Sequence, residues 1–230
     1  MNAPAAAARL SAVLFDLDGT LLDTAPDFVT AVNRLRAEHG LGGMPSPAIR
    51  ATVSHGARAL VRLAFGIADE DPAFEPLRQR LLALYEAHLL VDTVPFPGIA
   101  ELLQALAERG IRWGVVTNKP NYLAEPLLAR AHLEPPADVL VCPDHVSRTK
   151  PDPEPLLLAC ARLGCTVREA VYVGDHARDI QAGRNAGMRT IAATYGYLEP
   201  DEAVTQWQAD YHADSVPAIA HILFTHFLPT

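Results

Sequence analysis

The chain has 230 residues, half of them hydrophobic, and a formal net charge of −8 at pH 7. This length and composition suffice for a full hydrophobic core, in one large domain or in a domain with an insertion. The acidity argues against nucleic-acid binding, which needs a basic surface, and no apolar run is long enough to span a bilayer, so we expect neither nucleic acid nor membrane as a partner.

Residues 1–9 open the chain without the basic segment and following apolar segment of a signal peptide, so we expect only a short leader. Five short apolar runs come next, and they predict strands buried on both faces, as in a parallel sheet. The runs cover residues 12–15, 113–116, 139–141, 171–173 and 190–193.

Helical patterns alternate with these strands at residues 98–109, 153–163 and 180–186, each ending just before a glycine. Residues 210–213 and 216–227 predict an edge strand and a closing helix. The alternation predicts a doubly wound α/β fold of the Rossmann type, whose ligands bind at the carboxyl ends of the strands.

One long segment breaks the alternation. From about residue 24 to residue 94 the pattern predicts helices at 26–38, 46–65 and 71–90 and no strand. Asp23 and Thr24 are candidate caps for the first of these helices, because they come just before Pro26. We therefore expect a helical subdomain inserted after the first strand.

The segment that follows the first strand carries the strongest chemical signal. Asp16 and Asp18 lie two residues apart just past a buried strand, and Gly19 lets the backbone turn with its amide free for an anion. The alternative is a turn rich in aspartate that only closes the strand. Thr117 and Asp175 end two other predicted strands, so they converge on Asp16 at one edge of the sheet.

The chain has nineteen Lys and Arg residues, and only two of them are lysines. Lys119 and Lys150 therefore indicate positions that need a compact ammonium, unless a composition biased towards arginine placed them by chance. The three cysteines are odd in number and lack metal-binding spacing, which predicts reduced thiols in a cytoplasmic protein. They are Cys142, Cys160 and Cys165.

Four motifs follow one another along the chain. They are Asp16-Leu17-Asp18-Gly19-Thr20, Thr117-Asn118, Lys150-Pro151 and Gly174-Asp175-His176-Ala177-Arg178-Asp179. In this order they resemble the motifs of the haloacid dehalogenase superfamily of phosphotransferases. The match runs almost the full length of the chain, and in this superfamily such an insert is a cap that closes over the active site. The resemblance implies a catalytic core at residues 1–23 and 95–230 and a helical cap at 24–94.

The resemblance also implies a phosphatase mechanism that uses both aspartates. Asp16 would attack the phosphorus and form an aspartyl-phosphate. Asp18 would protonate the leaving oxygen and then deprotonate the water that hydrolyses the intermediate. The implied cofactor is Mg²⁺, bound by the Asp16 carboxylate, the Asp18 backbone carbonyl and Asp175.

The remaining motif residues receive supporting roles from the same resemblance. Thr117, Asn118 and the Gly19 amide would hold the transferring phosphoryl oxygens, and Lys150 would balance charge. Asp179 would orient a metal-bound water or Lys150. Two positions stay open: Lys119 either faces the site or is a solvated loop cation, and we expect His176 to be a rim residue and not a ligand.

The expected substrate is a small phosphorylated metabolite, and the cap decides which one. Residues 54–60 resemble the substrate-specificity loop of small helical caps, with His55, Gly56 and Arg58 facing the substrate; the alternative is an ordinary helix start with a surface arginine. The cap resembles the phosphoglycolate phosphatase group, and more closely a proteobacterial subgroup that acts on N-acetylmuramic acid 6-phosphate in cell-wall recycling. The stretches that carry this likeness are 54–60, 113–120, 142–146, 150–155 and 195–197.

Other functions remain as alternatives. A phosphomutase uses the same two aspartates but returns the phosphoryl group to a sugar. A phospho-accepting signalling domain and a non-catalytic binding protein are rivals from other classes, although all four motifs are filled here. The sequence makes no prediction of an oligomeric state.

Overall fold

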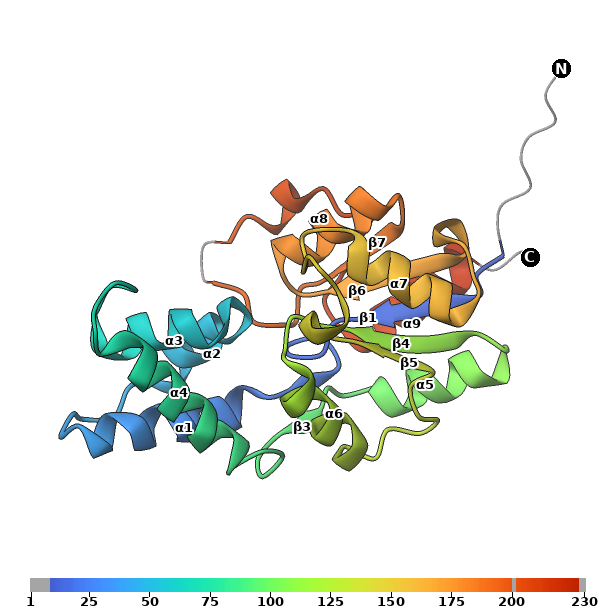
Figure 1. Ribbon diagram of the computed structural model, residues 1–230. Helices are drawn as coiled ribbons and strands as arrows, with labels where there is room; N and C mark the ends of the chain where they lie inside the picture. Colours follow the sequence, from blue (N-terminus) through green and yellow to red (C-terminus); the bar gives the residue numbers. More distant parts are fainter. Residues whose placement is uncertain (1–8, 200–201, 228–230) are drawn as a thin grey trace, which may run out of the picture.

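The computed structural model describes residues 9–199 and 202–227, so most of the expected N-terminal leader lies outside the described part. A six-stranded sheet forms the centre, with the order β5-β4-β1-β6-β7-β8 and every pairing parallel (Figure 1). The strands are β1 (Ala12–Phe15), β4 (Arg112–Val116), β5 (Val139–Val141), β6 (Ala170–Gly174), β7 (Arg189–Ala193) and β8 (Tyr211–Ala213). All six predicted strands are therefore present, and the predicted α/β class is confirmed.

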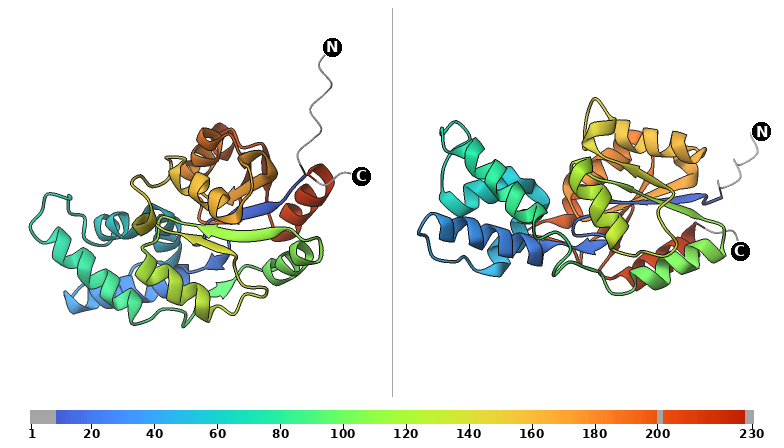
Figure 2. Two further views of the ribbon diagram at one scale, coloured as in Figure 1. Left: turned by 45° about the vertical axis from the view of Figure 1, so that its right-hand side comes forward. Right: turned by 60° about the horizontal axis from the view of Figure 1, so that its bottom comes forward.

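Helices cover both faces of this sheet (Figures 1 and 2). Alternate residues of β1 enter different clusters: Val13 and Phe15 pack with α5, α6 and α9, whereas Ala12 and Leu14 pack with α7 and α8. Because both faces of the sheet are buried, the sequences of its strands are unbroken apolar runs. The helices are α5 (Ile99–Glu108), α6 (Asn121–Arg130), α7 (Glu154–Leu163), α8 (Ala177–Ala186) and α9 (Val216–His226).

Helix α6 is absent from the predicted elements. It contains Pro126 in its interior, where a proline removes a backbone donor and weakens a helical pattern. Burial of Leu123, Ala124 and Leu127 against the core holds this helix in place.

The helical insert (residues 24–94) lies beside the carboxyl ends of the strands (Figure 1). Its helices are α1 (Ala25–Glu38), α2 (Ser46–Thr52), α3 (Gly56–Phe65) and α4 (Phe74–Glu86). The single helix predicted at 46–65 is wrong: a 3₁₀ turn at Val53–His55 separates α2 from α3, and Gly56 has φ 82° and ψ 180°. A continuous helix does not contain that backbone conformation, whereas glycine adopts it without a steric penalty.

The two ends of the insert are tied together by a short antiparallel pair, β2 (Leu22–Asp23) with β3 (Val94–Pro95). The expectation of no strand between residues 24 and 94 is therefore wrong at Val94, which belongs to β3. Thr24 does occupy the position before α1, but its side chain makes no capping bond, because its hydroxyl donates to Asp18 Oδ1 at 2.6 Å. Asp23 instead pairs with Arg50 at 2.7 Å.

Within the described residues, no helix combines the length and the apolar character needed to cross a membrane.

Candidate active site

Three buried carboxylates meet at the carboxyl edge of the sheet. Asp16 follows β1, Asp175 follows β6, and Asp179 lies in the first turn of α8. One oxygen from each lies within 4.8 Å of the others. Adjacent parallel strands β1 and β6 bring Asp16 and Asp175 together although they are far apart in sequence, as the sequence predicts.

Lys150 lies among these carboxylates with its ammonium buried. Nζ donates hydrogen bonds to Val116 O at 2.9 Å, Tyr172 Oη at 2.8 Å and Asp179 Oδ1 at 2.7 Å. Asp16 Oδ1 forms an ion pair with the same ammonium, with 2.9 Å between the two atoms. This oxygen is buried, and apart from the ion pair it has no partner among the described residues.

The electrostatics of the cluster are unbalanced without a further cation. Burial alone would raise the pKa of Asp16, but the charges of Lys150 and Arg178 hold it below its ordinary value of 3.8. Burial, together with the charges of Asp16 and Asp179, raises the pKa of Asp175 to about 7. Burial likewise raises the pKa of Asp179.

These observations match a site for a hard divalent cation. The cluster holds three carboxylates, the cations beside it are Lys150 and Arg178, and the donor set consists of oxygen atoms. Oxygen-rich sites of this kind suit Mg²⁺ or Ca²⁺.

Asp175 is also held by groups from distant segments. Thr20 Oγ1 donates to its Oδ1 at 3.1 Å, and Ser54 Oγ and the Tyr197 amide donate to its Oδ2, each at 3.0 Å. Ser54 belongs to the insert, so the loop before α3 reaches the carboxylate cluster directly. Tyr197 Oη in turn accepts from the amide of Ala25, the first residue of α1, at 2.9 Å.

Gly19 differs from expectation. Its amide is not free for an anion, because it donates to Leu22 O at 3.0 Å and closes the turn after β1. The glycine is needed for two other reasons: φ is +80°, and a Cβ at this position would lie 2.2 Å from Asp175 Oδ2. The residue therefore permits the close approach of the first and fourth motifs.

The second motif lies at the end of β4 and lines the pocket. Thr117 Oγ1 accepts from the Lys119 amide at 3.2 Å, and Asn118 Nδ2 donates to Lys150 O at 3.0 Å. Asn118 thus ties the end of β4 to the loop that carries Lys150.

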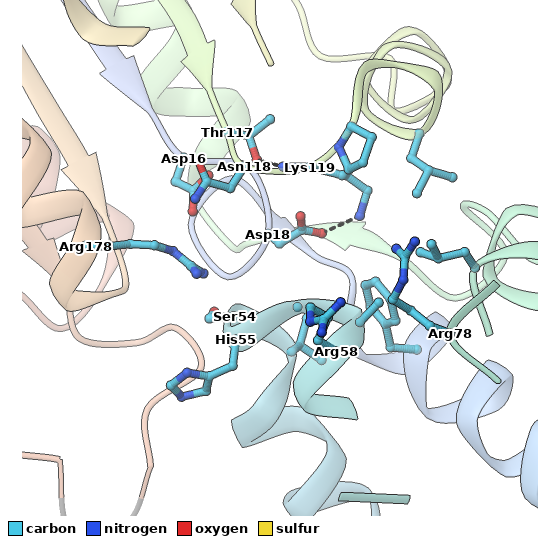
Figure 3. A pocket seen from close by; sticks show the side chains of 17 residues that line it. Asp16, Asp18, Ser54, His55, Arg58, Arg78, Thr117, Asn118, Lys119 and Arg178 are labelled. Carbon is cyan, nitrogen blue, oxygen red and sulfur yellow. Dashed lines mark hydrogen bonds and ion pairs between the residues drawn. The ribbon is translucent and has the colours of Figure 1, made fainter. Parts of the chain in front are cut away.

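Lys119 faces the site and is not a solvated loop cation. Its side chain is 4% exposed. Nζ donates to Asp18 Oδ1 at 2.9 Å (Figure 3) and to Tyr85 Oη, also at 2.9 Å. The ammonium also lies 4.5 Å from the ring centroid of Tyr85 and 5.0 Å from that of Phe28. Both rings belong to the insert, so the insert helps to position Asp18 through Lys119.

A cavity of about 300 Å³ lies between the sheet edge and the insert (Figure 3). It contains the predicted residues Asp16, Asp18, Thr117, Asn118, His55, Gly56 and Arg58 in its lining. Arg58 also forms an ion pair with Asp69 at 2.7 Å and is half exposed, so it combines a surface position with access to the pocket.

The two histidines near the cavity interact with each other. His176 Nδ1 accepts from the Arg178 amide at 3.1 Å and caps α8. Burial, with the nearby charges of Arg178 and His55, lowers the pKa of His176 to about 3. His55 Nε2 lies 3.3 Å from Glu199 Oε1 on the other side.

Arg178 is a site residue that the sequence reasoning did not assign. It lines the cavity beside Asp16 (Figure 3), and its Nε is buried with no partner among the described residues. In the sequence, its position within the fourth motif was the feature that could have identified it as a site residue. Arg78 also lines the cavity and was not assigned from the sequence. Ser54 lines it from the expected specificity loop, and Lys119 lines it as one of the two alternatives left open.

Comparison with known proteins agrees with this architecture. The family model described as haloacid dehalogenase-like hydrolase matches residues 13–193, and the chain belongs to this family. The chain is 49% identical over 215 residues to the N-acetylmuramic acid 6-phosphate phosphatase of Pseudomonas aeruginosa, covering 94% of this chain and 95% of the relative. It is 43% identical over 208 residues to a phosphoglycolate phosphatase of Xanthomonas campestris, covering 90% and 94%.

Solved structures give the same result. A predicted phosphoglycolate phosphatase from Haemophilus somnus aligns with a TM-score of 0.82 and 25% identity, covering 93% of this chain and 97% of that one. A putative phosphoglycolate phosphatase from Lactobacillus delbrueckii aligns with a TM-score of 0.80 and 27% identity, covering 96% and 100%.

Proposed function

We propose that this protein is a Mg²⁺-dependent phosphatase that hydrolyses N-acetylmuramic acid 6-phosphate through an aspartyl-phosphate on Asp16. The observation that carries the proposal is the state of Asp16. Its Oδ1 is buried in an ion pair with Lys150, 2.9 Å from Nζ, and the residue lines the cavity and lies close to two further carboxylates. A carboxylate that a neighbouring ammonium holds in its ionised form is suited to act as a nucleophile.

The residues that would hold Mg²⁺ are Asp16, Asp175 and the backbone carbonyl of Asp18. When bound there, the cation supplies positive charge that reduces repulsion between the Asp16 carboxylate and a phosphate dianion. We assign Asp179 to the orientation of Lys150, because its Oδ1 accepts from Nζ at 2.7 Å and its Oδ2 accepts from the His176 amide at 3.1 Å.

The first half of the reaction transfers the phosphoryl group to the protein. An Asp16 oxygen forms a bond to phosphorus while the bond from phosphorus to the ester oxygen breaks. Asp18, in its protonated form, gives its proton to the leaving alkoxide, which departs as an alcohol. Lys150 balances the charge of Asp16 during this step.

The second half regenerates the enzyme. Asp18, now a carboxylate, takes a proton from water, and the water oxygen attacks phosphorus. The bond from phosphorus to Asp16 breaks, inorganic phosphate leaves, and Asp18 is again protonated. Thr117, Asn118 and the unpartnered Nε of Arg178 are the groups available to bind the phosphoryl oxygens in both steps.

The cavity and the relatives together support the substrate. The lining includes residues of the insert as well as of the sheet edge, so we propose that residues 24–94 act as a cap on a catalytic core formed by 1–23 and 95–230. The relative that is 49% identical is named for N-acetylmuramic acid 6-phosphate. Phosphoglycolate is the alternative substrate, because other relatives at 43% identity are named for it. The three free cysteines support a cytoplasmic location.

Phosphate release from a panel of esters tests the proposal. The panel contains N-acetylmuramic acid 6-phosphate, phosphoglycolate, glucose 6-phosphate and a nucleotide, each with Mg²⁺ and with a chelator. We expect the highest kcat/KM with the first ester, dependence on Mg²⁺, and loss of activity in Asp16→Asn. Release that persists with the chelator or in Asp16→Asn overturns the mechanism, and a higher kcat/KM with phosphoglycolate overturns the substrate. Isomerisation of a hexose 1-phosphate without phosphate release would instead identify a phosphomutase.

A further inference from the structure

The cavity wall carries a surplus of positive charge, although the whole chain has a net charge of −8. Two carboxylates line it, those of Asp16 and Asp18. Four cationic side chains also line it, namely Lys119, Arg178, Arg58 and Arg78. A single phosphate ester that reacts at Asp16 would engage only part of this positive charge.

Two of the cations lie away from the reacting group. Arg58 is on α3 and Arg78 is on α4, and in Figure 3 both lie on the side of the pocket opposite Asp16 and Arg178. Phe28, Leu82, Leu123 and other apolar residues form the wall of the same cavity. The cavity therefore has a phosphate end, apolar walls and a second cationic end.

Arg58 is held in position by a carboxylate that it shares with a second arginine. Its Nε and Nη2 donate to Asp69 Oδ2 at 3.2 Å and 2.7 Å, and its guanidinium carbon lies 4.9 Å from the centroid of the Phe74 ring. Asp69 also accepts two hydrogen bonds from Arg62, each 2.6 Å long, so one carboxylate serves two guanidinium groups. No hydrogen bond involves Arg58 Nη1 in the described part of the chain.

Arg78, on the neighbouring helix, pairs with a carboxylate of its own but also keeps one guanidinium nitrogen without a partner in the described structure. Its Nε and Nη2 donate to Glu75 at 2.9 Å and 2.6 Å, and its Nη1 has no partner among residues 9–199 and 202–227. Both arginines influence the same carboxylate: hydrogen bonding from Arg78 is the main cause that lowers the pKa of Glu75 to about 2, and the charge of Arg58 adds to it. Both arginines line the cavity, whereas neither Asp69 nor Glu75 does.

We propose that Arg58 and Arg78 form a second anion subsite, which binds a carboxylate on the part of the substrate that does not react. A guanidinium group matches a carboxylate geometrically, and each of these two has an uncommitted Nη1. The inference rests on the proposed function, because it takes the phosphate end of the ligand to lie at Asp16. It adds that the enzyme selects esters that carry both a phosphate and a carboxylate.

A matched pair of substrates isolates the carboxylate. N-Acetylmuramic acid 6-phosphate and N-acetylglucosamine 6-phosphate share the sugar ring, the N-acetyl group and the phosphate, but only the first carries a lactyl carboxylate. Steady-state kinetics with both esters should give a lower KM for the first in the parent enzyme. Arg58→Ala and Arg78→Ala should each raise that KM about tenfold, the size expected for one charge-assisted hydrogen bond. The KM for N-acetylglucosamine 6-phosphate should stay within about twofold, because no such bond is lost.

The chain supplies a control for each variant. Arg62 is on α3 and shares Asp69 with Arg58, and Arg80 is on α4 and pairs with Glu38; neither lines the cavity. Arg62→Ala and Arg80→Ala should leave KM unchanged for both esters. Hydrolysis of p-nitrophenyl phosphate, which has no carboxylate, reports whether each variant is folded. If Arg58→Ala is unfolded, Arg58→Gln replaces it, because glutamine retains most of the aliphatic stem.

Equal changes in KM for the two sugar phosphates, or no change for either, would overturn the subsite. A parent enzyme that leaves N-acetylmuramic acid 6-phosphate intact contradicts the proposed substrate, which is a separate failure. The same variants are then compared on phosphoglycolate and ethyl phosphate, which differ mainly in the carboxylate. A selective loss with phosphoglycolate supports the subsite, and an equal loss on both overturns it.

Discussion

The Lys119 ammonium donates a hydrogen bond to the Asp18 carboxylate, with 2.9 Å between Nζ and Oδ1. The same carboxylate oxygen accepts from Thr24 Oγ1 at 2.6 Å. Thr24 precedes the first helix of the insert, and Lys119 contacts Tyr85 on the fourth, so the proposed acid–base group is oriented by contacts with both ends of the insert.

Replacement of Lys119 by methionine tests this positioning role. Methionine retains the unbranched stem but removes the ammonium, so Asp18 loses a partner and protonates the leaving oxygen less effectively. We expect kcat/KM for an alkyl phosphate to fall about tenfold or more, as is typical when general acid catalysis is impaired. The fall should be smaller for p-nitrophenyl phosphate, because p-nitrophenolate leaves without protonation. Tyr85→Phe, which keeps the Lys119–Asp18 bond, is the control, and an equal loss with both esters would contradict the role.

Lys150→Arg should not behave as a conservative change. The Lys150 side chain is fully buried, and its ammonium contacts Val116 O, Tyr172 Oη and the carboxylates of Asp179 and Asp16. A planar guanidinium group is larger and cannot reproduce this arrangement. We expect phosphatase activity to fall by more than about threefold, measured as kcat/KM with the best ester of the panel. Activity within that range would show that charge alone is sufficient at this position.

Arg178→Met should weaken the binding of inorganic phosphate. The Nε of Arg178 is buried, lacks a partner in the described structure and belongs to a residue that lines the cavity. A donor of this kind contributes to binding mainly when an anion accepts its hydrogen bond. We expect the inhibition constant of phosphate to rise about tenfold. Arg184→Met, on the same helix but outside the cavity lining, should leave it unchanged.

Divalent cations should stabilise the protein through the carboxylate cluster. Mg²⁺ added to chelator-treated protein, without substrate, should raise the unfolding temperature. The expected rise is about 2–4 °C for each kcal/mol that Mg²⁺ binding adds to the free energy of unfolding. Asp175→Asn should abolish most of the rise, because it removes one of the three clustered carboxylates. Glu108→Gln, a change on the exposed surface of α5, should retain it. An equal rise in all three proteins would mean that the cation acts elsewhere.

The sheet was predictable because its strands are buried on both faces. The runs, such as residues 12–15, are unbroken in apolar character, and three of the five lead directly into a motif. The insert was harder, because its helix breaks depend on single residues: Gly56 interrupts the predicted helix at 46–65 through its backbone conformation. Helix α6 was missed because Pro126 masks its periodicity, and tertiary packing overrides that signal.

The site was predictable where residues follow strands directly. Asp16 and Asp175 meet because their strands are neighbours. Ser54 and Lys119 could not be assigned in this way, since their contacts depend on how the insert packs against the sheet edge. Gly19 illustrates the limit of motif reasoning: its amide is used within its own turn, and the glycine is needed for the close approach of Asp175.

Covalent trapping on Asp16 tests the central claim most directly. The enzyme is mixed with its best substrate, quenched rapidly in acid, digested and analysed by mass spectrometry. The account predicts a phosphoryl group on the peptide that contains Asp16, and none in Asp16→Asn. The absence of a phosphorylated peptide from an enzyme that is turning over, or a phosphoryl group on a different residue, would contradict it.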